Sequence, residues 1–120
     1  MAKAPKRVVI ERTERELAAT SDEAAGLWGS FMGLMFKRAI PARTSIILQP
    51  AMGIHTFLMR FDLDLVYLDE QDVVTKVRTK MVLWRLDFTA AAACIELNGG
   101  ETADVGLQVG DRLLLLPTTP

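Results

Sequence analysis

Three residues have side chains that carry acid–base chemistry and lie within or beside apolar stretches: His55, Asp64 and Glu96. His55 is the only histidine, and it shares one face of the expected extended segment 54–60 with apolar side chains. An imidazole in that position could contact a ligand or transfer a proton. A lone histidine on an apolar face is more often a hydrogen-bonded core residue, and this structural interpretation is favoured.

The two carboxylates could each orient His55, as carboxylates do for working imidazoles. Asp64 directly precedes the apolar residues 65–68, and an aspartate at the start of a buried strand usually accepts hydrogen bonds from backbone N–H groups in a turn. Glu96 lies between two apolar residues of segment 92–97. If those two residues face the core, alternation sends Glu96 to the other face, where we expect it to be solvated.

Trp84 and Arg85 place an aromatic ring beside a permanent cation, a pair that suits flat or anionic ligands and partner proteins. The alternative is a tryptophan that covers one end of a sheet while the arginine extends to solvent. No catalytic triad spacing, phosphate-binding glycine loop or zinc pattern is present, so we assign no catalytic residue, cofactor or metal. The candidate binding residues are His55, Asp64, Trp84, Arg85 and Glu96.

The amino-acid composition and net charge narrow the class of protein. Half of the 120 residues are apolar and 24% are charged, which is typical of one globular domain. The net charge of −1 gives no general attraction to nucleic acid or to anionic lipid, and the longest apolar stretch, 26–36, is too short to span a bilayer. We therefore expect a cytoplasmic protein with a flexible tail over 1–6 and one domain over 7–117. The single cysteine, Cys94, excludes an internal disulfide and is expected in the core.

Short β-type segments dominate the elements that must position these residues. The expected strands are 7–10, 44–48, 54–60, 64–68, 73–77, 80–84, 92–97 and 112–116. The polar residues 69–72 join two of them in the clearest hairpin. One helix is predicted over 21–32, from a capping box of Thr20 and Glu23 and a 3.6-residue apolar period. A single helical turn is predicted over 101–105, closed by Gly106. These elements predict a mainly β fold, either a small β-sandwich or a partly open β-barrel.

A family resemblance rests on six segments that occur in order. They are GLMFKR at 33–38, IHTFLMRF at 54–61, DLVYLD at 64–69, LWR at 83–85, IEL at 95–97 and GLQVGD at 106–111. Over about residues 18–115 the chain resembles Domain of Unknown Function 192 (DUF192), a family of small prokaryotic proteins. The resemblance implies a mostly β fold and no established activity, and a fold alone does not decide a function.

Three functions fit these observations. The first is a non-enzymatic module that binds a small molecule, sugar or peptide, because a few polar groups on apolar strands are the usual composition of a ligand site. The second is an enzyme, for example a hydrolase, that uses His55 with Asp64 or Glu96. The third is an interaction or assembly module that uses an exposed strand edge or Trp84. The binding module is favoured, and the sequence decides neither the ligand nor the oligomeric state.

Overall fold

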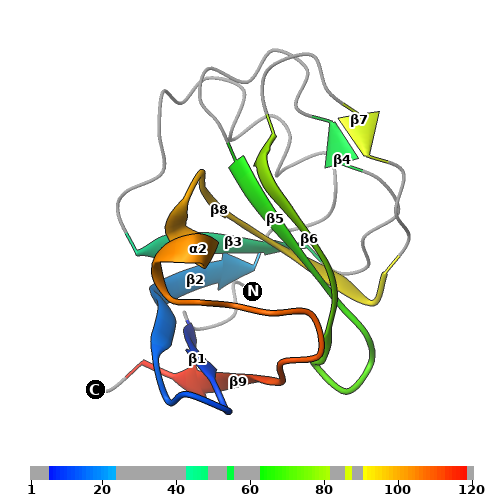
Figure 1. Ribbon diagram of the computed structural model, residues 1–120. Helices are drawn as coiled ribbons and strands as arrows, with labels where there is room; N and C mark the ends of the chain where they lie inside the picture. Colours follow the sequence, from blue (N-terminus) through cyan, green and yellow to red (C-terminus); the bar gives the residue numbers. More distant parts are fainter. Residues whose placement is uncertain are drawn as a thin grey trace.

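The computed structural model describes residues 6–23, 43–48, 54–55, 63–81, 86–87 and 91–118, which are mainly β (Figure 1). Their elements are β1 (Lys6–Ile10), β2 (Glu16–Glu23), β3 (Thr44–Leu48), β4 (Ile54–His55), β5 (Leu63–Leu68), β6 (Val74–Met81), β7 (Leu86–Asp87), β8 (Ala93–Asn98), α2 (Glu101–Asp104) and β9 (Leu113–Pro117). No helix of this described part is long and apolar enough to cross a membrane.

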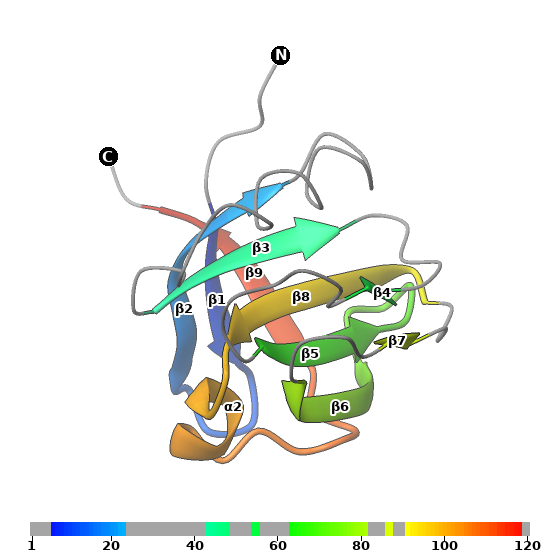
Figure 2. The ribbon, with the colours of Figure 1, turned by 90° about the horizontal axis from the view of Figure 1, so that it is seen from above.

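Seven of the strands form one mixed sheet in the order β6-β5-β8-β3-β2-β1-β9, and β4 pairs with β7 in a small second sheet. Only the β2–β3 pair of the large sheet is parallel. The large sheet bends strongly, so that β1 and β9 cross beneath the strands of the other half (Figure 2). The four strands β6-β5-β8-β3 thereby pack against the three strands β2-β1-β9, which gives a sandwich-like arrangement.

One hydrophobic core joins the two halves of the sheet. It contains Val8, Ile10, Leu17 and Leu113 from the three-stranded half and Ile47, Val66, Leu68 and Ile95 from the four-stranded half. Each of these side chains is at most 2% exposed. Period-2 alternation in β5 and β8 supplies the inward-facing residues of this core. The prediction of a mainly β fold is confirmed.

The two edges of the large sheet meet at one point. Val73 and Arg112 form an isolated bridge, the Val74 N–H donates to the Asp111 carbonyl at 2.8 Å, and the Gly110 N–H donates to the Val74 carbonyl at 2.8 Å. Gly110 has a φ of 95°, a conformation that favours glycine. Among the described residues these edges are not paired along their length, so the sheet is not closed into a barrel.

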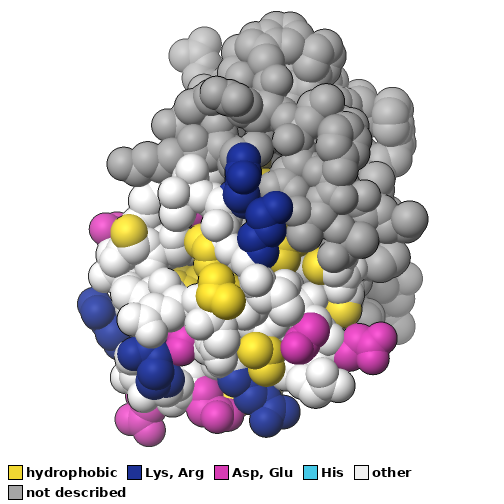
Figure 3. All heavy atoms as spheres, turned by 45° about the vertical axis from the view of Figure 1, so that its right-hand side comes forward, with side chains coloured by type: hydrophobic (Ala, Val, Ile, Leu, Met, Phe, Trp, Pro, Cys, Tyr) yellow, Lys and Arg dark blue, Asp and Glu magenta, His cyan; other side chains and the backbone are white. Residues whose placement is uncertain are grey.

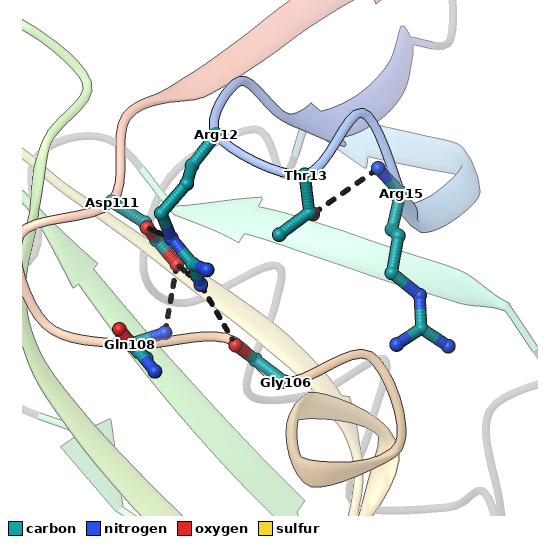
Figure 4. Close-up of polar contacts among 6 residues, drawn as sticks. All are labelled: Arg12, Thr13, Arg15, Gly106, Gln108 and Asp111. Carbon is teal, nitrogen blue, oxygen red and sulfur yellow. Dashed lines mark hydrogen bonds and ion pairs between the residues drawn. The ribbon is translucent and has the colours of Figure 1, made fainter.

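An ion pair links the β1–β2 turn to the segment before β9 (Figure 4). Arg12 Nε donates to Asp111 Oδ1 at 2.6 Å, and a terminal guanidinium nitrogen donates to Asp111 Oδ2 at 3.0 Å and to the Gly106 carbonyl at 3.1 Å. Asp111 Oδ2 also accepts from the Gln108 N–H at 2.8 Å. Its hydrogen bond with Arg12 lowers the pKa of Asp111 below the ordinary value of 3.8. The contact therefore holds together two segments that are 99 residues apart.

Replacing Asp111 with asparagine is expected to lower the melting temperature at pH 7 by about 5 °C, because the two-point contact with Arg12 is lost. A carboxyl whose folded pKa is depressed contributes stability above its ordinary pKa and loses it as the pH falls through the folded value. The difference between parent and variant should therefore shrink below pH 3.8. Thermal melting of both proteins at several pH values measures this difference in melting temperature. The control is Glu11→Gln, which removes an exposed carboxylate. A difference that does not change with pH would contradict the assignment.

The prediction of a helix over 21–32 is wrong at its start. Residues 21–23 belong to β2 and pair in parallel with β3, and the Ser21 and Ser45 hydroxyls lie 2.5 Å apart in a buried position. Pairing with a strand far along the chain overrides the local capping signal. Residues 24–32 lie outside the described residues. Other boundaries also differ. Lys6 already belongs to β1, residues 80–81 continue β6 rather than begin a new strand, and β5, β6, β8 and β9 each begin one residue away from the expected position.

The hairpin and the helical turn are confirmed. Residues 69–72 connect β5 to β6, and Asp69 Oδ1 accepts from the Gln71 N–H at 2.8 Å and the Val73 N–H at 3.0 Å. Aspartate is favoured in turns because its side chain can bind the backbone two residues further on. The helical turn is α2, and Gly106 follows it with a φ of 69°.

Candidate functional site

Asp64 and Glu96 lie on neighbouring strands, β5 and β8, but on opposite faces of the sheet. The register places Asp64 opposite Leu97 and Glu96 opposite Leu65. Directly paired residues share a face, whereas consecutive residues alternate. Asp64 is therefore on the face of Leu97 and the hydrophobic core, and Glu96 is on the other face. The two carboxylates do not belong to one site.

Asp64 binds the start of α2. It is fully buried, and its Oδ1 accepts from the Gly100 N–H at 3.0 Å. Its Oδ2 accepts from the Thr102 N–H at 3.0 Å and from the Thr102 hydroxyl at 2.6 Å. The first N–H groups of a helix have no partner within the helix, and here a carboxylate from the adjacent strand supplies one. Both oxygens of Asp64 are thus engaged in holding α2 against the sheet.

Glu96 is buried, and the expectation of a solvated side chain is wrong. It is 3% exposed, and within the described residues its Oε2 has no hydrogen-bond partner. Burial disfavours the charged form and raises the pKa of Glu96 to about 8. At neutral pH the carboxyl therefore keeps its proton and can donate a hydrogen bond. Alternation correctly placed Glu96 on the face away from Ile95 and Leu97, but it could not reveal that this face is covered too.

The surroundings of Glu96 follow from the strand register. Leu65 of β5 and Ile46 of β3 are paired with Glu96, and Tyr67 is paired with Cys94, two residues earlier in β8. Strand β6 adds two cations, because Lys76 is paired with Tyr67 and Arg78 with Leu65. We call this surface the Glu96 face; its described side chains are Leu63, Leu65, Tyr67, Lys76, Arg78, Cys94 and Glu96.

The Glu96 face combines an apolar interior with a basic margin. Leu63, Leu65, Tyr67 and Cys94 are fully buried, whereas Arg78 is exposed. The Lys76 ammonium lies 5.8 Å from the centroid of the Tyr67 ring, within the range of a cation–π interaction. Figure 3 shows exposed basic and hydrophobic side chains on one side of the molecule; the apolar side chains of the Glu96 face are fully buried and are not among those exposed. Tyr67 and the two cations were not predicted as site residues, because only the pairing register aligns them with Glu96.

The other three predicted site residues have side chains that lie outside the described part of the structure. His55 lies in β4, where its backbone pairs with Leu86, but its side chain is outside the described set, as are Trp84 and Arg85. Cys94 is a buried cysteine that is not part of a disulfide, as expected. In the described ranges no three His, Cys, Asp or Glu residues gather closely enough to hold a metal ion.

Comparison with solved structures supports the fold. A proposed transcription regulator from Sinorhizobium meliloti 1021 is similar, with a TM-score of 0.79 and 20% identity, over 96% of each chain. A protein of unknown function from Novosphingobium aromaticivorans DSM 12444 has a TM-score of 0.72 and 18% identity, over 95% of this chain and 92% of that one. At these identities the likeness shows the fold alone.

The sequence was also compared with curated proteins and with protein-family profiles. No curated protein matches the chain significantly. The profile of DUF192, described as Uncharacterized ACR, matches residues 7–115 and so covers nearly the whole sequence. The resemblance that six short segments indicated is thereby confirmed. The chain belongs to the DUF192 family.

Proposed function

We propose that this protein is a non-enzymatic binding domain whose small-molecule ligand hydrogen-bonds with the Glu96 carboxyl. The observation that carries the proposal is the buried Glu96 carboxyl, whose Oε2 has no hydrogen-bond partner among the described residues. Buried polar atoms are nearly always hydrogen-bonded, and one that is not destabilises a fold by about 1–3 kcal/mol. A ligand that hydrogen-bonds to Glu96 would remove this penalty. Buried ionisable groups with a shifted pKa are also common at functional sites.

Binding is better supported than the alternatives. An enzyme using His55 with Asp64 would need a carboxylate that is available to the imidazole, and both Asp64 oxygens bind the start of α2. The description of the Sinorhizobium meliloti protein as a regulator suggests nucleic acid, but a net charge of −1 gives this chain no electrostatic attraction to it. The proposal includes a cytoplasmic location, which fits a single buried cysteine that is not part of a disulfide.

The test is a thermal-shift screen of the parent protein against a library of small metabolites, followed by calorimetric titration of the hits. We expect hits that bind the parent at least about tenfold more tightly than Glu96→Leu, because leucine can form no hydrogen bond with the ligand. The matched control is Glu70→Gln, which alters an exposed carboxylate in the β5–β6 turn and should bind like the parent. A screen without hits, or hits that bind Glu96→Leu as tightly as the parent, would refute the proposal.

A further inference from the structure

We propose that Asn98 is a modification site: its side-chain amide cyclises onto the backbone nitrogen of Gly99 and hydrolyses to aspartate and isoaspartate, and the isoaspartate form releases α2 from the sheet. This inference goes beyond the proposed function and needs no ligand. It is carried by the sequence Asn98-Gly99-Gly100 between β8 and α2 and by the contacts that fix this turn.

The chemistry uses only the chain and water. The deprotonated Gly99 nitrogen bonds to the side-chain carbonyl carbon of Asn98, and the amide nitrogen of that side chain leaves as ammonia, which takes up a proton. The product is a five-membered succinimide ring, which water then opens. Opening at the former side-chain carbonyl gives aspartate, whereas opening at the main-chain carbonyl gives isoaspartate, whose backbone is one carbon atom longer. Asparagine is among the thermolabile residues of proteins.

The turn leaves the reacting nitrogen accessible. Asn98 is the last residue of β8, and it is half-buried, as is Gly99. Glycine has no Cβ that would shield its nitrogen or restrict its rotation. Among the described residues the Gly99 N–H donates to no acceptor, whereas the Asn98 N–H donates to Glu101 Oε1 at 3.0 Å and the Gly100 N–H donates to Asp64 Oδ1 at 3.0 Å. The nitrogen that must react is therefore not held by the contacts that fix the turn.

The modified chain no longer fits α2 against the sheet. The turn presents the Gly100 N–H and the Thr102 N–H to the two oxygens of Asp64, each at 3.0 Å. Isoaspartate adds a main-chain carbon atom just before these N–H groups and so displaces them from Asp64. A carboxylate at position 98 also lies beside Glu101, and like charges repel. The result is the loss of the hydrogen bonds that hold the start of α2.

The first experiment ages the intact protein at pH 7 and at pH 8 and separates acidic forms by ion exchange. Asn98 is the only asparagine in the chain, so isoaspartate at an amide position, mapped by digestion and mass spectrometry, identifies this residue. We expect the acidic form to appear about tenfold faster at pH 8, because the deprotonated fraction of a very weak acid rises tenfold per pH unit.

Two variants test the assignment. Gly99→Ala places a methyl group beside the reacting nitrogen and should slow the reaction severalfold; Gly99, unlike Gly100, does not have a positive φ, so alanine fits its backbone. Asn98→Gln keeps a side-chain amide but would need a less favourable six-membered ring, so it should give no acidic form over the same time. An acidic form that arises equally in Asn98→Gln would exclude Asn98 as its source.

The second experiment measures amide hydrogen exchange in the purified isoaspartate form. We expect the Thr102 N–H to exchange at least about tenfold faster than in fresh protein, because it has lost its carboxylate partner. The N–H of Ile95, in the core of β8, is the control and should change little. Unchanged exchange at Thr102 would overturn the release of α2.

A synthetic peptide of residues 96–102 gives the rate at which the same sequence reacts without a fold. Conversion of both the peptide and the intact protein, slowed in each by Gly99→Ala, supports the modification site. An intact protein that stays unmodified while the peptide converts would mean that the fold protects Asn98, and the proposal would then be wrong. A peptide that does not convert would refute the chemistry itself.

Discussion

Replacing Glu96 with glutamine is expected to stabilise the protein at pH 7 by as much as about 3 kcal/mol. The Glu96 pKa rises from 4.5 to about 8 on folding, and each unit corresponds to about 1.4 kcal/mol. At pH 7, ionisation of the Glu96 carboxyl lowers the free energy of the unfolded chain, whereas the folded chain keeps this carboxyl protonated. Glutamine has nearly the same shape and no proton to lose, so the variant avoids this cost.

The sign of the effect follows from linkage. A carboxyl whose folded pKa is raised binds more protons in the folded state, so the stability of the parent falls as the pH rises from the ordinary pKa of 4.5 to about 8. The difference between parent and Glu96→Gln should be small below pH 4.5, grow through this range and become constant above pH 8. Urea unfolding of both proteins at several pH values measures this difference in the free energy of unfolding.

The exposed Glu70→Gln variant is the control, since it removes a carboxylate without changing a buried group. It should follow the parent within about 0.5 kcal/mol at each pH. A Glu96→Gln protein that is less stable than the parent at pH 7 would mean that Glu96 is ionised and paired in the fold. A stabilised variant would instead identify a residue that lowers stability, as residues retained for function often do.

Replacing Asp64 with alanine is expected to destabilise the protein by about 3 kcal/mol or more. The change leaves the Gly100 N–H, the Thr102 N–H and the Thr102 hydroxyl without their carboxylate partner. Each buried donor that loses its partner costs about 1–3 kcal/mol. Asp64→Asn keeps one acceptor oxygen and should lie between the parent and the alanine variant.

The same urea measurement tests this role. Thr102→Val removes only the hydroxyl donor and should cost about 1 kcal/mol in the parent, but much less in the Asp64→Ala background, because the hydrogen bond is then already absent. Asp104→Ala, on an exposed position of α2, is the control and should change stability by no more than about 0.5 kcal/mol. Equal effects of Thr102→Val in the two backgrounds would exclude the coupling. Opposite signs for Glu96→Gln and Asp64→Ala would separate a site residue from a structural one.

The sequence by itself determined the strand content and the short-range turns. Strand β3 covers residues 44–48 as predicted, since a short β-branched and apolar run needs no distant partner to favour an extended conformation. The β5–β6 hairpin was readable because Asp69 makes the contacts that stabilise its turn within the next four residues. The turn of α2 ending before Gly106 was likewise a local signal.

Only the tertiary structure decided which residues come together. The alternation of side chains along a strand predicts that Glu96 and Ile95 lie on opposite faces of the sheet. Whether each face is covered depends on parts of the chain far away in sequence. Local chemistry favoured a helix at residue 21, whereas parallel pairing with β3 made it a strand. The contact between Arg12 and Asp111 spans 99 residues, so no local pattern encodes it. Periodicity is a property of neighbouring residues, while register and burial are set by long-range packing, and the candidate site is made by register and burial.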